Sequence, residues 1–171
     1  MKKSHPIWHN FLLYIVFIFY IVILVAILFR AKHAVRVVKL VPFGTIIDFL
    51  SRDAVSYIFI ISNLLGNVVL FIPLGIYLEL FNPDKEMKVN VFWGFLVSLI
   101  VEIIQYIGKL GVGDIDDVIL NSLGGYIGVV IYRKLLLKYK EKEKVKNIIE
   151  IMALITAIIS FPILMYYRKK I

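Results

Sequence analysis

Residues 11–29 read FLLYIVFIFYIVILVAILF, a run of nineteen residues without a charged side chain. A bilayer's hydrocarbon core is about 30 Å thick, and a helix rises about 1.5 Å per residue, so about 20 apolar residues cross it. The whole chain of 171 residues has the same character, with 61% hydrophobic and 19% charged residues and a mean hydropathy of +0.89. That composition excludes a water-soluble domain and predicts an integral membrane protein.

Further apolar runs predict additional spans. Lipid offers no hydrogen-bond partners to bare backbone, and the long unbroken runs favour helices over the short alternating strands of a barrel. We therefore expect an all-α integral membrane protein, a compact bundle of about five transmembrane helices. The predicted spans are residues 8–29, 57–81, 90–108, 115–137 and 148–167.

The chain divides by its pattern into three parts. Residues 1–39 form an N-terminal signal-anchor helix and its flank, because no small-x-small cleavage pattern follows the first apolar run. Residues 40–137 form the core, and residues 138–171 a basic loop with the C-terminal transmembrane helix. The connection 30–56 is too apolar for a free loop, so we expect it to lie in the membrane interface or to fold back against the bundle.

The net charge of +8 comes from 20 Lys and Arg against 12 Asp and Glu. The basic residues crowd the ends of the apolar runs, which is typical of membrane topology and lipid headgroup contact rather than of nucleic-acid binding. Seven basic residues fall within 133–146, which we expect to be a short cytoplasmic loop. This predicts a multi-pass protein of the cell membrane with a cytoplasmic N-terminus and an extracytoplasmic acidic cluster. The chain has no cysteine, which excludes disulfides and thiolate chemistry.

The acidic cluster lies at residues 113–125, GDIDDVILNSLGG, where the fourth span begins. Ionisable groups at this depth are costly to desolvate and therefore indicate a functional site. Asp114 suits the N-cap of the following helix, and Asp116 suits its first turn, where the helix dipole favours anions.

Asp117 begins a stripe down the fourth span. Asp117, Asn121, Gly124 and Gly128 follow one another at steps of four, three and four, so they share one helix face, and Val129 lies off it. The two glycines form a small-xxx-small pair. We expect this stripe to pack against the second and third spans.

Polar residues on those two spans complete the candidate site. Asn63 and Asn67 are four residues apart on the second span, where Pro73 is expected to bend the helix, and Glu102 and Gln105 are three apart on the third. Interhelical packing, capping and a carboxyl held by a neighbouring helix are the competing structural explanations. The predicted catalytic residues are Glu102 and Asp117, and the predicted binding residues are Asn63, Asn67, Gln105, Asp114, Asp116 and Asn121.

Such an oxygen-rich cluster suits Mg²⁺ or Ca²⁺, or equally the hydroxyls and amides of a glycolipid headgroup. The pattern selects neither, so the metal and the cofactor stay open. The chain has no HExxH, no phosphate-binding glycine loop and no G-x-S-x-G, and its three histidines flank the first span.

In these motifs the chain resembles the VanZ family of small bacterial membrane proteins, over about residues 40–130. The matching elements are the Pro42-Phe43 connection, Asn63-x-x-Gly66-Asn67, Phe71-x-Pro73-x-Gly75, Glu102-x-x-Gln105, and Asp114-Ile115-Asp116-Asp117 leading into Asn121 and Gly124-Gly125. The resemblance implies a cell-envelope role in which some members lower susceptibility to the glycopeptide antibiotic teicoplanin. It implies no established reaction.

Three functional hypotheses follow. The first is a VanZ-like protein that binds or alters an envelope lipid or glycan intermediate, with membrane lipids and a lipid-linked envelope precursor as partners and no nucleic acid. The second is an intramembrane metal-dependent enzyme acting on a lipid-linked substrate through Glu102 and Asp117. The third is a structural partner subunit whose polar stripe only packs helices.

Overall fold

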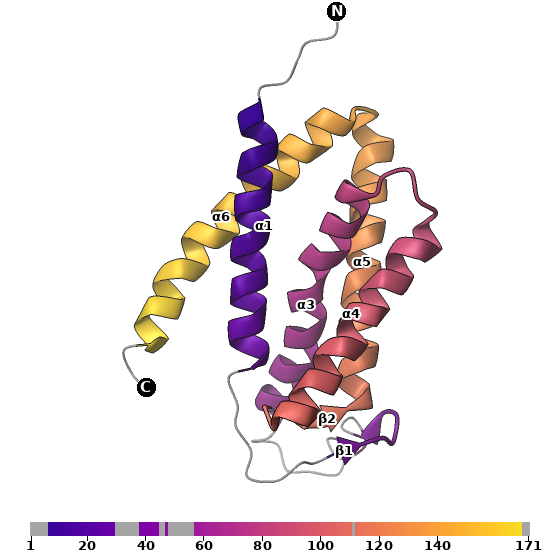
Figure 1. The fold of residues 1–171 in the computed structure, drawn as a ribbon, viewed down its shortest axis with the longest axis vertical. Helices are drawn as coiled ribbons and strands as arrows, with labels where there is room; N and C mark the ends of the chain where they lie inside the picture. The colour runs from indigo at the N-terminus through magenta and orange to yellow at the C-terminus, as the bar shows by residue number, and fades with distance from the viewer. Residues whose placement is uncertain (1–6, 30–37, 45–46, 48–56, 111, 169–171) are drawn as a thin grey trace, which may run out of the picture. The chain divides into compact units, whose positions relative to one another are not determined.

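The computed structural model describes residues 7–29, 38–44, 47, 57–110 and 112–168. Over these residues the elements are α1 (Ile7–Leu28), β1 (Val38–Lys39), α3 (Tyr57–Phe81), α4 (Met87–Gly108), β2 (Gly113–Asp114), α5 (Ile115–Tyr139) and α6 (Lys142–Arg168) (Figure 1). Helices α1, α3, α4 and α5 are each long and apolar enough to cross a membrane. The prediction of an all-α membrane protein is therefore confirmed. Helix α6 covers the residues of the predicted fifth span, 148–167, but is not among these four helices, so that span stays a prediction.

The chain separates into two compact units, one of Ile27–Leu135 and one of Met1–Ala26 with Leu136–Ile171. The first unit contains α3, α4, most of α5 and both strands. All candidate residues named from the sequence fall in this unit.

Helices α3 and α5 meet at glycines of the predicted stripe. A Cβ atom built on Gly124 would overlap the carbonyl oxygen of Val68, and one built on Gly128 would overlap that of Ile72. Such overlap means that the two helix backbones touch where a side chain would hold them apart. The expectation that this stripe packs against the second span is confirmed.

Glycines on the partner helices complete this contact. A Cβ atom built on Gly75 of α3 would overlap the carbonyl oxygen of Gly125 of α5. A Cβ atom built on Gly125 would lie 3.8 Å from the Cα atom of Gly94 of α4, which is ordinary contact. The third span therefore meets α5 through Gly125, one residue along from the predicted stripe. Helix α3 continues through Pro73 to Phe81.

The α4–α5 connection is held by backbone pairing. Lys109 adopts a left-handed conformation with φ 55° and ends α4, its N–H directed at the carbonyls of Gln105 and Tyr106. The next residues form β2, which pairs in parallel with β1 in the register Val38 to Gly113 and Lys39 to Asp114. The sequence analysis did not predict these strands, because two residues are too few to show alternation.

The apolar connection does return to the helices where the structure describes it. Its backbone pairs through β1, and the Phe43 N–H donates to Asp116 Oδ1 at 2.5 Å. The side chains of Leu40, Val41 and Phe43 are more than half exposed, at 74%, 68% and 54%. The expected return to the helices is therefore found for the described part of this segment, and its position in the membrane interface stays a prediction.

The predicted basic loop at 133–146 is almost entirely helical, which corrects its description as a loop. Helix α5 continues to Tyr139 and α6 begins at Lys142, so two residues lie between them. Lys140 makes the turn with φ 56°, and its N–H donates to the Leu136 carbonyl at 2.8 Å. The basic residues are helix formers, and they extend both helices instead of separating them.

An ion pair between a buried glutamate and a partly exposed arginine joins the end of α3 and the α3–α4 turn to α5. Glu79 is 1% exposed and accepts from Arg133 Nε at 2.9 Å, while Arg133 Nη2 donates to the Lys85 carbonyl at 2.9 Å. The sequence analysis did not single out Glu79, because it lies near the end of a span where charged residues are ordinary. The pair fixes the turn because a buried carboxylate without its cation is strongly unfavourable.

Candidate functional site

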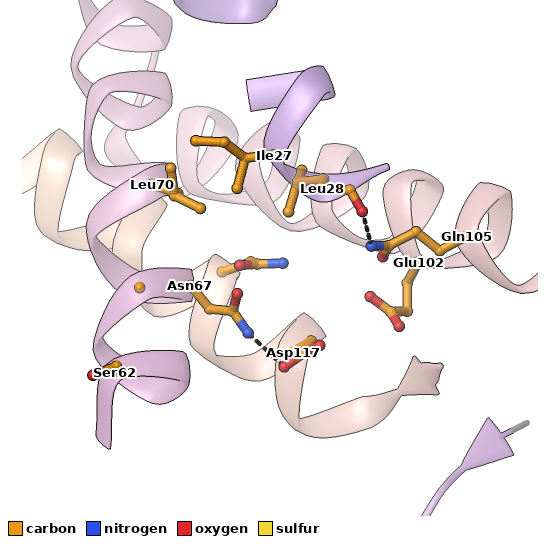
Figure 2. A pocket seen from close by; sticks show the side chains of 10 residues that line it. Ile27, Leu28, Ser62, Asn67, Leu70, Glu102, Gln105 and Asp117 are labelled. Atoms are coloured by element: carbon orange, nitrogen blue, oxygen red, sulfur yellow. Dashed lines mark hydrogen bonds between the residues drawn. The ribbon is translucent and has the colours of Figure 1, made fainter. Parts of the chain in front are cut away.

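Polar side chains from α3, α4 and α5 line a cavity of about 320 Å³. Figure 2 shows the carboxylates of Glu102 and Asp117 facing one open space. The lining residues are Ile27, Leu28, Ser62, Gly66, Asn67, Leu70, Glu102, Gln105, Asp117 and Asn121. The volume is at the lower end for small-molecule sites, and the mixture of apolar walls with a few polar groups is typical of them.

Asp117 of α5 is held by Asn67 of α3. The Asn67 Nδ2 atom donates to Asp117 Oδ1 at 2.5 Å (Figure 2). The amide carries no formal charge, so this bond orients the Asp117 carboxyl group without supplying a counter-ion.

Glu102 of α4 has its two carboxyl oxygens in different roles. Oε1 accepts from the backbone N–H of Asp114 at 2.6 Å, which ties α4 to the start of α5. Oε2 is buried and has no hydrogen-bond partner, and the residue as a whole is 7% exposed. A buried acceptor without a donor is rare in folded proteins, and it indicates a missing ligand, water or ion.

Asn121 carries a second such acceptor. It is 1% exposed, and its Oδ1 is buried without a partner. Asn121 lies one turn beyond Asp117 on the same face of α5, as the stripe predicted. The site therefore contains two buried oxygen atoms, one on Glu102 and one on Asn121, that no donor satisfies in the described part of the chain.

Gln105 connects the pocket to the end of α1. Its Nε2 donates to the Leu28 carbonyl at 2.8 Å (Figure 2). The last four carbonyls of a helix have no partner inside it, so this bond satisfies one of them. The contact also explains how Ile27 and Leu28, which the sequence analysis did not propose, come to line the pocket.

Asp114 and Asp116 do not line the pocket. Asp114 Oδ1 accepts from the Asp116 N–H at 2.9 Å, the bond expected of an N-cap, and Asp116 Oδ1 holds the Phe43 N–H. Both residues are buried, at 8% and 3% exposed. The arrangement fits the capping explanation offered for Asp114, while Asp116 lies in the first turn of α5 and holds the backbone of the apolar connection. Their proposed binding role has no support from the pocket's lining.

The α3 residues that line the pocket are only in part the predicted ones. Asn67 lines the pocket as proposed, while the side chain of Asn63 lies outside the described residues. Ser62, Gly66 and Leu70 also line it. Their spacing of four residues was a readable signal of a common face.

Metal binding needs several ligands that converge. Among the described residues there is no group of three or more His, Cys, Asp and Glu side chains that could hold a metal ion. Glu102 and Asp117 provide two carboxylates, and each already has one oxygen in a hydrogen bond. The site can attract a positively charged or donor-rich group, and its lining contains no Lys, Arg or His to hold an anion.

The fold and the site together define a class: a polytopic α-helical membrane protein with an acidic pocket between its helices. Within that class the chain belongs to the VanZ/LLP1 family, which it matches over residues 11–138. It is 31% identical over 106 residues to Protein VanZ of Enterococcus faecium. That alignment covers 62% of this chain and 63% of the relative, so the chain spans less than two thirds of the relative's length. No solved structure matches the chain.

Proposed function

We propose that this chain acts in the bacterial cell envelope, where it binds or alters a lipid or glycan intermediate and lowers susceptibility to glycopeptide antibiotics such as teicoplanin. The observation that carries the proposal is the pair of carboxylates, Glu102 from α4 and Asp117 from α5, on one pocket of a VanZ-family membrane protein. Two ionisable groups are costly to place among apolar helices, so a purely structural role is a poor explanation for both.

We also propose that the pocket faces the outside of the cell. Seven basic residues between 133 and 146 resist translocation, even on helix ends, and therefore favour a cytoplasmic position for the α5–α6 turn. A helix of the length of α5 crosses the bilayer once, which would bring its first turn, with Asp117, to the opposite side. Envelope intermediates and glycopeptide drugs meet on that side.

The test is protection of a teicoplanin-susceptible bacterium that expresses this chain. Glu102→Gln and Asp117→Asn keep side-chain shape and remove charge, so we expect each to lose most of the protection while accumulating normally. Glu86→Gln is the matched control, because Glu86 is an exposed carboxylate, paired with Lys88 and outside the pocket lining. Full protection by both pocket variants would contradict the proposal.

An intramembrane enzyme is the second candidate, and the same pair of carboxylates favours it, since an acid and a base on one pocket are what proton transfer requires. Turnover of purified envelope lipids would distinguish the two. Product formation that Glu102→Gln abolishes would establish the enzyme, while tight binding without product would favour the binding protein.

A further inference from the structure

The pocket's unsatisfied atoms specify the chemistry of what it binds. Two side-chain amides of the lining are engaged with the protein, Asn67 Nδ2 with Asp117 and Gln105 Nε2 with the Leu28 carbonyl. The buried atoms of the lining that have no partner are both acceptors, Glu102 Oε2 and Asn121 Oδ1, each on a residue more than nine-tenths buried. A ligand that satisfies this pocket must therefore donate hydrogen bonds.

The charge of the pocket further limits which ligands it can bind. Two carboxylates and no Lys, Arg or His line it. A phosphate or carboxylate group would meet the two carboxyl groups there without an intervening cation, and a neutral hydroxyl would bring no positive charge to them. The described cation that interacts electrostatically with Asp117 is Lys39 of β1, which lies outside the lining. The remaining candidates are a cationic donor and a metal ion.

The coordination available favours a cationic donor over a metal. Ca²⁺ takes six to eight oxygen ligands and Mg²⁺ requires near-octahedral geometry. Here Glu102 Oε1 and Asp117 Oδ1 are already committed to protein donors. A primary ammonium group has three N–H donors, and the residues of the lining carry three acceptor groups, Glu102 Oε2, Asn121 Oδ1 and the Asp117 carboxylate.

The apolar part of the lining indicates where the ammonium comes from. Ile27, Leu28 and Leu70 form the apolar part of the wall. The helices around the pocket also carry large exposed apolar side chains, among them Leu65 on α3 and Ile107 on α4. In a bilayer, lipid chains cover such surfaces, and a headgroup extends from those chains to the depth of the helix ends.

We propose that the pocket binds the primary ammonium headgroup of an amine-bearing membrane lipid, with Glu102, Asp117 and Asn121 as acceptors. This inference rests on the proposed function for its biological setting, because it names the class of lipid that the envelope protein would recognise. The ammonium enters as a threefold donor, and its single positive charge offsets that of one carboxylate.

Lipid binding by the full-length protein tests the proposal. Protein purified in mild detergent would be incubated with phosphatidylethanolamine, phosphatidylcholine or phosphatidylglycerol of identical acyl chains, and the bound lipid measured by native mass spectrometry. Phosphatidylcholine is the informative comparison, because its trimethylammonium has the same charge and no N–H donor. Hydrogen bonds to charged groups are worth about 1.5–3 kcal/mol, so we expect a preference for phosphatidylethanolamine of about tenfold or more over both other lipids.

Several outcomes would overturn the proposal. Equal binding of phosphatidylcholine would remove the hydrogen-bond requirement, and preference for phosphatidylglycerol would reverse the charge argument. Competition by Mg²⁺ or Ca²⁺ at micromolar concentration would make the pocket a metal site. Free ethanolamine that binds as tightly as the phospholipid would overturn the assignment to a lipid.

Variants tie the preference to the named atoms. Glu102→Gln keeps an Oε1 for the Asp114 N–H but places an NH₂ donor where Oε2 faces the pocket, so we expect the preference to fall by about tenfold. Glu86→Gln should leave it unchanged. Melting of the lipid-free variant in detergent, expected to match the unmodified protein, separates lost binding from lost folding. Retained preference in both Glu102→Gln and Asp117→Asn would refute the site.

Lipid binding and drug protection can fail independently. If phosphatidylethanolamine is not preferred while Glu102→Gln still abolishes protection from teicoplanin, the ammonium inference is wrong and the proposed function stands. If the preference depends on Glu102 but protection does not, the pocket binds the lipid and the proposed function is wrong.

Discussion

Gly128→Ala adds one methyl group to the face of α5 that packs on α3, and we expect it to destabilise the protein. The new Cβ atom would overlap the Ile72 carbonyl oxygen and would lie 2.9 Å from the Ile76 nitrogen and 3.0 Å from the Gly75 Cα atom. All of these are backbone atoms, so no side-chain rotation can relieve the overlap, and the two helices must move apart.

The magnitude follows from two opposing effects. Overpacking in a well-packed core typically costs about 1–3 kcal/mol, and contact with rigid backbone favours the upper end. Alanine is better than glycine in a helix by about 1 kcal/mol, which offsets part of that cost. The expected net loss is about 2 kcal/mol, equivalent to a melting temperature lower by about 4–8 °C for a chain of this size.

Thermal aggregation in detergent measures this loss, with Gly94→Ala as the matched control. Gly94 is also a buried glycine of a membrane-spanning helix, but its Cβ position is 3.8 Å from Leu78 Cδ1 and 3.9 Å from Gly125 Cα, which is ordinary contact. We therefore expect Gly94→Ala to melt at the same temperature as the unmodified protein or slightly above it. Equal melting of Gly128→Ala and Gly94→Ala would refute the close approach of α3 and α5.

The larger changes Gly124→Leu and Gly128→Leu should destabilise further and disperse the pocket. Val129, which the sequence places off the glycine stripe, is fully buried and cannot act as their lipid-facing control. Tyr126 is 45% exposed on the same helix, so Tyr126→Leu is the suitable comparison.

Three further predictions concern other parts of the chain. Because the chain has no native cysteine, a single cysteine introduced at Val112 should react with a membrane-impermeant reagent in intact cells, and one introduced at Lys142 should not. The reverse pattern would invert the proposed topology. Arg133→Leu should lower the free energy of unfolding by about 3 kcal/mol, measured by melting in detergent, because it leaves Glu79 buried without its cation. The double variant with Glu79→Leu should recover much of that loss. Asp116→Ala should make the apolar connection more sensitive to limited proteolysis without lowering lipid binding, since Asp116 holds the Phe43 backbone and does not line the pocket. Unchanged cleavage would show that the pairing of β1 with β2 is enough to hold this connection.

The membrane helices and much of the site are readable from the sequence for a physical reason. A span must be long and apolar, because lipid satisfies no polar group, and this requirement leaves an unbroken run such as residues 11–29. The same cost makes isolated polar residues conspicuous, so Glu102, Gln105, Asp117 and Asn121 stood out and do line one pocket. Helical periodicity then predicted the glycine contact.

The sequence could not assign each polar group its partner. Asp114, Asp116 and Asp117 are adjacent and chemically alike, yet only Asp117 lines the pocket while the other two hold backbone N–H groups. That division depends on side-chain direction, which changes by about 100° per residue around a helix and takes effect only when a neighbouring element is in place.

Long-range contacts are the part that only the tertiary structure decided. The pairing of β1 with β2 joins residues about 75 positions apart through two residues each, and the bond from Gln105 to the Leu28 carbonyl spans 77 positions. Both contacts involve backbone groups, which every residue has, so neither contact can be predicted from composition or spacing. What the sequence by itself determined is which residues are too costly to leave in lipid without a reason. The packing of α3, α4 and α5 decided which oxygen atoms of the pocket lining the protein satisfies, and it leaves Glu102 Oε2 and Asn121 Oδ1 without a donor in the described part of the chain.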